Sequence, residues 1–288
     1  MNDWLLLSLG SLTLGLSVIL MRFGRQHGAR PAPMMLFIGL VPCLATAPFV
    51  WNRLGEFSCG YAALMVAGGL LGYGGQAALI EALGRGPVGP TFIIRSFAIL
   101  VPVAASALFY DEPLGPTRVA GLALACLAIP LLQTGHTSPG ASAEHRRAGA
   151  VWLAYCLASL ALLGGADWVF RDAARPNASF QFILGVVFLG YLGNILGAVV
   201  AIPLGRAWPT RADALWGSAA GLCSLAAFAL SLLVLRHLGG VLVFPARSVI
   251  SIAAALALAF LFFRERPALR AAAGMALGAA GIVLLAMK

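Results

Sequence analysis

The sequence FIIRS at residues 92–96 resembles FPARS at residues 244–248, with Phe, Arg and Ser at the same positions. In each copy the arginine lies inside an otherwise apolar stretch. Each copy is followed by a Phe-x-x-Glu pattern, which ends at Glu112 in the first and at Glu265 in the second. The offset between the copies is 152 residues at the arginines and 153 at the glutamates. Agreement over this length indicates an internal duplication.

The composition excludes an ordinary soluble protein. Of the 288 residues, 61% are hydrophobic and only 10% are charged, whereas about 25% are charged in soluble domains. Windows without charge, such as residues 31–52 and 57–80, are long enough to cross roughly 30 Å of hydrocarbon as helices. We therefore expect an all-α integral membrane protein.

Charged residues and Pro or Gly punctuation delimit ten transmembrane spans. The predicted ranges are 4–21, 31–51, 58–82, 89–110, 117–135, 148–170, 178–204, 212–235, 240–263 and 269–287. The longest polar connector, residues 136–147, separates a first set of five spans in residues 1–135 from a second set in residues 148–288. All six tryptophans fall near predicted span ends, where an amphipathic ring favours the membrane interface.

A repeat with an odd number of spans has a topological consequence. The second copy enters the membrane from the opposite side, so the two five-helix halves are related by a pseudo-two-fold axis in the membrane plane. Such inverted repeats alternate access to a central cavity near the bilayer midplane. The architecture therefore predicts a carrier.

Ten spans arranged as five plus five, with the pairs Glu112…Gly121 and Glu265…Gly274 after the fourth and ninth spans, resemble the EamA family of the drug/metabolite transporter superfamily. The resemblance covers essentially the whole chain. It implies a ten-helix bundle around a central cavity that carries amino acids, related metabolites, sugars or drugs, commonly outward across the bacterial cytoplasmic (inner) membrane. The Asn-Tyr-x-x-Pro pattern of aromatic amino-acid exporters is replaced here by Phe92-Ile93-Ile94-Arg95.

Arg95 and Arg247 are the strongest candidates for function, because an arginine at a helix centre costs about 2.5–3.5 kcal/mol on insertion scales. Each lies about six residues inside its span, or roughly 9 Å from one membrane face. Because the second half is inverted, Arg95 is close to one membrane face and Arg247 to the other. They should thus lie roughly 10–15 Å apart along the membrane normal. Structural ion pairs, Glu81 with Arg95 and Asp167 with Arg247, could neutralise them. Alternatively, the guanidinium groups bind a carboxylate or phosphate of the substrate, which would compete with these acids and couple binding to gating.

Other polar residues are candidates for lining the cavity. Tyr73 and Gln76 lie three positions apart and should share one helix face, either toward substrate or in helix-to-helix hydrogen bonds. Ser96 and Ser248 follow the two arginines and complete the predicted substrate-binding set. Glu112 and Glu265 precede the fifth and tenth spans, where a carboxylate interacts favourably with the helix dipole.

The sequence predicts neither a metal nor a cofactor. The five cysteines form no CxxC and the four histidines fall in predicted loops, so the spacing of a metal site is missing. The glycine-rich residues 68–75 are followed by no lysine and favour close helix packing over phosphate binding. Basic residues stand one to three at a time between spans, which is typical of membrane anchors and not of nucleic-acid binding.

The orientation of the termini stays open. Of the 19 basic residues, the ten-span topology puts eleven on the face opposite the N-terminus, six on the N-terminal face and two within spans. The positive-inside rule then predicts both termini outside, whereas the family resemblance implies both inside.

The sequence favours a secondary transporter. It predicts only the chemical class of the substrate, a small polar metabolite with a carboxylate or phosphate, and amino-acid-like compounds are the leading subset of that class. A flippase of an anionic or glycosylated lipid is the alternative. An intramembrane enzyme would need paired carboxylates, a Ser/His pair or metal ligands at membrane depth, which the sequence does not offer, so we expect no enzyme. The coupling ion, the direction and the choice between monomer and homodimer stay open.

Overall fold

The computed structural model describes residues 3–99, 101, 115–132, 143–171, 179–238 and 269–286, with further single residues and short pieces between 247 and 262. Within these ranges all regular elements are helices and no strand occurs. They are α1 (Asp3–Gln26), α2 (Pro31–Val50), η1 (Trp51–Glu56), α3 (Cys59–Arg85), α4 (Val88–Ser96), η2 (Phe97–Ile99), α6 (Pro116–Leu132), α7 (Ala143–Arg171), α8 (Phe180–Leu204), α9 (Arg211–Leu238) and α11 (Leu269–Ala286).

Among the described residues, six helices are long and apolar enough to cross a membrane: α1, α2, α3, α7, α8 and α9. Large apolar side chains also cover the outer surface of the bundle. On α1, Leu5, Leu9 and Leu12 are half-exposed or more and recur at helical spacing, as expected of a face in contact with lipid. The protein is therefore an all-helical chain whose long helices are suited to an integral membrane protein.

The helix ends differ from the predicted spans in two places. The fourth predicted span, 89–110, is not one continuous α-helix, because α4 ends at Ser96 and continues as the 3-10 turn η2. The helix α7 begins at Ala143, inside the predicted connector 136–147. Glu112 and Glu265 lie outside the described residues.

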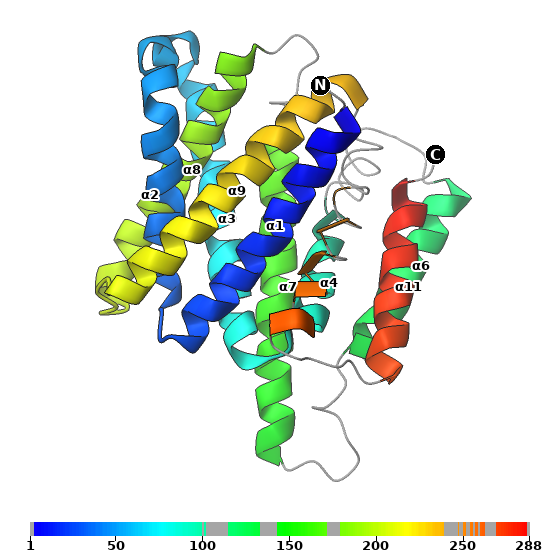
Figure 1. Cartoon of the computed structure of the whole chain (residues 1–288). Coiled ribbons are helices and arrows are strands. Elements are labelled where there is room, and N and C mark those ends of the chain that lie inside the picture. The colour runs from blue at the N-terminus through cyan, green and yellow to red at the C-terminus, as the bar shows by residue number, and fades with distance from the viewer. Residues whose placement is uncertain are drawn as a thin grey trace.

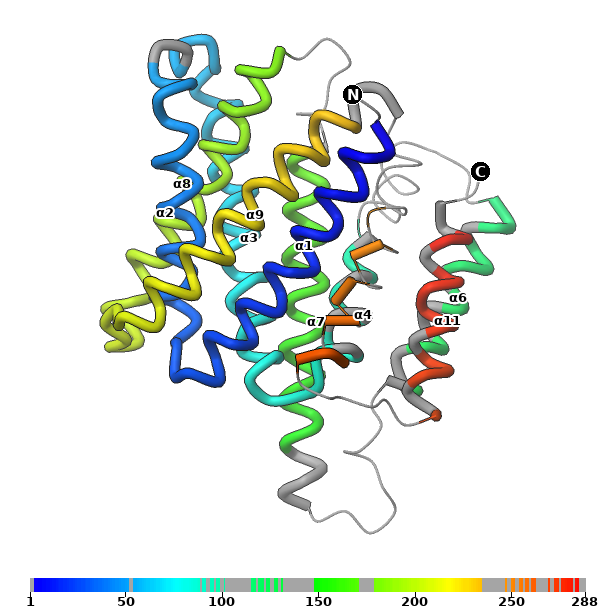
Figure 2. Tube along the Cα trace, viewed as in Figure 1, coloured from blue at the N-terminus to red at the C-terminus, as the bar shows by residue number. Residues whose placement is uncertain are grey.

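The helices form a bundle in which α1 begins and α11 ends at the same end (Figure 1). We call this end the N-terminal face and the other end, where α2, α4 and α7 begin, the opposite face. Figure 2 follows the chain in the same view, with α2 and α8 on one side and α6 and α11 on the other.

The most extensive packing is between α1 and α9, α3 and α7, α2 and α8, α6 and α11, α3 and α8, and α2 and α9. A glycine that packs against a carbonyl oxygen and a small side chain of another segment occurs twice, once on α1 and once on α7. A Cβ atom on Gly15 of α1 would lie 3.1 Å from the carbonyl oxygen of Ser251 and 2.9 Å from Cβ of Ala254. A Cβ atom on Gly164 of α7 would lie 2.6 Å from the carbonyl oxygen of Ala98 and also against the side chain of Val101.

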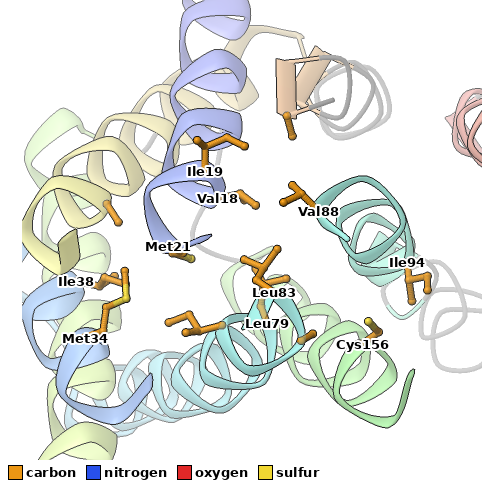
Figure 3. Close-up of a cluster of buried hydrophobic side chains, with 14 of the residues drawn as sticks. Val18, Ile19, Met21, Met34, Ile38, Leu79, Leu83, Val88, Ile94 and Cys156 are labelled. Atoms are coloured by element: carbon orange, nitrogen blue, oxygen red, sulfur yellow. The ribbon is translucent and has the colours of Figure 1, made fainter. Parts of the chain in front are cut away.

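The largest apolar core lies in the half of the bundle toward the opposite face. Figure 3 shows side chains from five helices converging there: Val18, Ile19, Met21, Met34, Ile38, Leu79, Leu83, Val88, Ile94 and Cys156. In a membrane these apolar side chains stabilise the bundle mainly by close van der Waals packing, because lipid tails are as apolar as the core itself. This core holds the last turns of α1 and α3 and the helix α4 against the first half of α7.

Trp152 belongs to this core, so its prediction as a membrane-interface residue is wrong. Its side chain is only 1% exposed, and its indole N–H donates to the Thr91 hydroxyl at 2.9 Å. Thr91 in turn donates to the carbonyl oxygen of Pro87 at 2.6 Å. A buried indole needs such a partner, and the bond ties α7 to the first turn of α4.

Asp213 stabilises the start of α9. Its carboxylate accepts hydrogen bonds from the Thr210 backbone N–H at 2.8 Å, from the Thr210 hydroxyl at 2.6 Å and from the Arg30 backbone N–H at 2.7 Å. This arrangement is a capping box that also fastens the start of α2.

Asp213→Ala is expected to lower the free energy of unfolding by about 1–2 kcal/mol, because the first turn of α9 and the Arg30 backbone N–H lose a capping acceptor. Asp213→Asn keeps one acceptor oxygen and should lose less. Thermal unfolding in detergent measures both variants. Equal melting of the alanine variant and the parent would contradict the capping role.

Candidate functional site

A cavity of about 100 Å³ lies inside the bundle, and we call it the central cavity. It has room for several water molecules, so in this conformation a ligand must be small. Its polar lining comes from six helical segments distant in sequence: Gln76, Arg95, Asp167, Tyr191, Asn194, Ser224 and Arg247. The remainder consists of glycines and of apolar side chains that include Phe170 and Phe228.

Both arginines of the sequence repeat line this cavity, although 152 residues separate them. The two guanidinium groups repel each other, and the carboxylate of Asp167 attracts both. Asp167 thus lies within electrostatic reach of Arg247, as the predicted ion pair requires, and of Arg95 as well. These three side chains carry two positive charges and one negative charge.

The backbone around Arg95 suits a cation. Arg95 lies in the last turn of α4, where the partial negative charge of the helix dipole favours a guanidinium group. The α-helix ends one residue later and η2 follows. Interrupted helices at membrane depth are tolerated where they line a cavity. The change from α4 to η2 comes one residue after Arg95, which lines the central cavity.

Glu81 makes ion pairs with Arg25 and Arg85, and not with Arg95 as predicted. Its Oε2 accepts from Arg85 Nη2 at 2.9 Å and from Arg25 Nη2 at 3.4 Å, whereas Arg95 lines the central cavity. Arg85 lies one turn further along α3, and Arg25 comes from the last turn of α1. Because Glu81 lies close to the end of α3, partners at that end of the bundle reach it first.

Tyr73 and Gln76 do not share a cavity, contrary to the prediction. Gln76 lines the central cavity, while Tyr73 lines a second cavity of about 530 Å³. We call this second cavity the vestibule, because its walls include Arg25, Arg30 and Gly205, which lie at helix ends on the opposite face.

The two serines of the predicted set stay untested. Ser96 belongs to α4, but its side chain lies outside the described part of the structure, and Ser248 lies wholly outside it.

Several cavity residues were weak or absent in the sequence prediction. The Tyr191 hydroxyl and the Ser224 hydroxyl are 2.8 Å apart and share a hydrogen bond. Phe170 and Phe228 pack edge to face, with ring centroids 5.3 Å apart. Tyr191 and Asn194 are weaker candidates from the sequence, as uncharged polar residues within an apolar span. A lone serine or phenylalanine in an apolar helix carries no such signal, so Ser224, Phe170 and Phe228 could be found only from the packing.

Two acceptor oxygens in the cavity remain available for a ligand. The side-chain oxygens of Gln76 and Asn194 are buried and have no hydrogen-bond partner within the described ranges. A buried polar atom without a partner costs about 1–3 kcal/mol, so a bound ligand or water that donates to them is favoured. Over the same ranges, no three His, Cys, Asp or Glu side chains are placed to hold a metal ion.

Comparison with known proteins shows the fold alone. No family model matches the chain, and no curated protein matches it. A solved structure described as "Crystal structure of protein" is similar over 97% of this chain and 94% of its own, with a TM-score of 0.65 and 17% sequence identity. Similarity over nearly the whole of both chains means that the complete helical bundle, and not one piece of it, is shared.

Proposed function

We propose that the protein is a secondary transporter of a small polar organic metabolite that carries a carboxylate or phosphate. The observation that carries this proposal is the convergence of Arg95 and Arg247, with Asp167, on one small cavity inside an apolar bundle. Ionisable residues at membrane depth are costly and commonly mark substrate or ion pathways. A planar guanidinium group fits a carboxylate or phosphate in two parallel hydrogen bonds.

The proposal includes ten membrane helices in two inverted repeats, residues 1–135 and 148–288. In such a repeat α1 corresponds to α7, α2 to α8, α3 to α9 and α6 to α11. The six most extensive helix pairs obey this correspondence: the pair α1–α9 becomes α7–α3, the pair α2–α9 becomes α8–α3, and the pairs α2–α8 and α6–α11 become themselves. The contacts of Gly15 and Gly164 agree with the exchange, because Ser251 and Ala254 follow Ala98 and Val101 by 153 residues each. The two glutamates of the sequence repeat have the same offset.

The charges suggest how binding could be coupled to movement. Asp167 balances one of the two guanidinium groups, and an anionic substrate group would supply the second negative charge. The substrate then shifts the contacts between α7 and the segments that hold Arg95 and Arg247. Alternating access in inverted repeats requires such a difference in contacts between the two states.

The family and the cellular setting are part of the proposal. The Glu112…Gly121 and Glu265…Gly274 pairs and the five-plus-five spans support membership of the EamA family. On that basis the protein is an exporter in a bacterial inner membrane, driven by a gradient, with amino-acid-like compounds as the leading cargo.

A thermal-shift screen of the detergent-purified protein tests the function, because a ligand that binds the native state raises its melting temperature. The panel contains amino acids, phosphorylated metabolites, nucleotide sugars and lipid phosphates. We expect stabilisation by a small carboxylate or phosphate, lost in Arg95→Ala and Arg247→Ala. The exposed Arg211 supplies the matched control, since Arg211→Ala should respond like the parent.

Two results would contradict the proposal. Stabilisation by cationic or neutral compounds only would give the arginines a structural role. Stabilisation by lipid phosphates only would indicate a lipid flippase instead of a metabolite transporter.

A further inference from the structure

The central cavity and the vestibule lie one above the other along α8. Asn194 lines the central cavity, and Ala201 lines the vestibule. The two residues are seven positions apart, which corresponds to two turns, or about 10 Å. Gly197 lies between these two levels, so whatever covers Gly197 separates the two cavities on this side.

The ring of Tyr73 covers Gly197. A Cβ atom on Gly197 would lie 2.6 Å from Cγ and from Cδ1 of Tyr73, so the ring packs directly on the bare backbone of α8. Next to Tyr73 on α3, a Cβ atom on Gly74 would lie 3.1 Å from Leu162 Cδ1, and one on Gly75 would lie 2.6 Å from Leu163 Cγ. Residues 73–75 of α3 thus form a layer that packs on α8 on one side and on α7 on the other.

Tyr73 is the part of this layer with space to move into. It is only partly buried and faces the vestibule of about 530 Å³, whereas Leu163 is 7% exposed and faces the central cavity. Rotation of a tyrosine side chain needs no movement of the helix backbone, and such rotamer changes are fast compared with the turnover of a carrier.

We infer that Tyr73 is the gate between the vestibule and the central cavity, and that substrate passes the opposite face by displacing its ring from Gly197. The inference rests on the proposed function, in which the central cavity holds the substrate. The vestibule walls carry Arg25, Arg30 and Glu81, a net positive charge that attracts an anionic substrate to the gate.

Cysteine labelling tests the gate without any substrate. The five native cysteines are replaced, and Ala166→Cys then supplies a thiol in the central cavity, which Ala166 lines at 4% exposure. A small, membrane-impermeant, anionic thiosulfonate is added to sealed vesicles from each side. We expect Tyr73→Ala to raise the labelling rate from the opposite face by about tenfold and to leave labelling from the N-terminal face unchanged.

Tyr73→Phe is the matched control and should label like the parent, because the ring itself blocks the path. Gly197→Ala is the second variant, since its methyl group must displace the ring from α8, and it should also raise labelling from the opposite face. Thermal unfolding shows whether each variant is folded. Unchanged labelling in folded Tyr73→Ala and Gly197→Ala would overturn the gate, as would equal acceleration from both faces.

The labelling result is independent of the proposed function. Stabilisation by cationic or neutral compounds only, together with accelerated labelling, would refute the proposed transport of a small anion and keep the gate. A successful screen with unchanged labelling would keep the transporter and place its access route elsewhere.

Discussion

Asp167→Ala is expected to lower the free energy of unfolding by about 3–5 kcal/mol in the absence of ligand, because removing one partner of a buried charge cluster leaves the others uncompensated. The loss has two sources. The carboxylate attracts both Arg95 and Arg247, and the two guanidinium groups repel each other. Denaturant or thermal unfolding of the purified protein in detergent measures the change.

Glu81→Ala is the matched control. Glu81 also lies between two arginines, Arg25 and Arg85, but all three side chains are reached by solvent, with 22% of the Glu81 side chain exposed. Ion pairs that solvent reaches contribute about 0–1 kcal/mol, and both pairs of Glu81 are only partly buried, so this variant should lose much less stability than Asp167→Ala.

The double variant Asp167→Asn with Arg247→Gln tests the electrostatic explanation directly. It removes one charge of each sign and should recover part of the stability lost in Asp167→Asn alone, whereas unrelated effects would add. Additive losses would show that Asp167 stabilises the bundle by packing and not by charge.

The long helices could be predicted from the sequence because uncharged windows of sufficient length have few alternatives in a membrane. The early end of α4 could not. Residues 97–99 are Phe, Ala and Ile, and the nearest signal is Pro102, which lacks the N–H that would bond to the Ala98 carbonyl in an α-helix. That proline predicts a kink in the span, but not the residue at which the α-helix ends. The 3-10 turn lies where the Ala98 carbonyl oxygen meets Gly164 of α7, a contact between residues far apart in the sequence.

The arginines of the central cavity could be predicted because they break an apolar pattern at two equivalent places. Their neighbours were harder. The pairing of Glu81 with Arg95 considered only the hairpin of two adjacent spans, whereas the Arg25 that reaches Glu81 comes from α1, 56 residues away. Local spacing contains no information on such a partner.

Tyr73 and Gln76 show a different limit of helical spacing. Residues three positions apart are displaced by about 60° around the helix axis, which counts as one face in a sequence analysis. At a helix that packs closely on both α7 and α8, this angle is enough to send one side chain to each cavity.

Gly69→Ala is expected to be among the most disruptive single-methyl changes in the chain, because α3 and α8 cross there with backbone against backbone. A Cβ atom on Gly69 would overlap the carbonyl oxygen of Gly190, and one on Gly193 would overlap the carbonyl oxygen of Val66. Neither obstacle is the flexible end of a side chain, so the helices themselves must separate. Overpacking of this kind costs about 1–3 kcal/mol and can cost more, and we expect the upper end of that range.

Gly72→Ala, one turn further along the same helix, separates this steric effect from helix propensity. Its Cβ atom would meet only the Asn194 side-chain oxygen, at 3.9 Å, so the methyl group fits. Alanine favours a helix over glycine by about 1 kcal/mol, and this variant should therefore melt at or above the parent temperature while Gly69→Ala melts well below it. If both variants melted alike, the close crossing of α3 and α8 would not be what holds these two helices together, and the small residues along them would need another explanation.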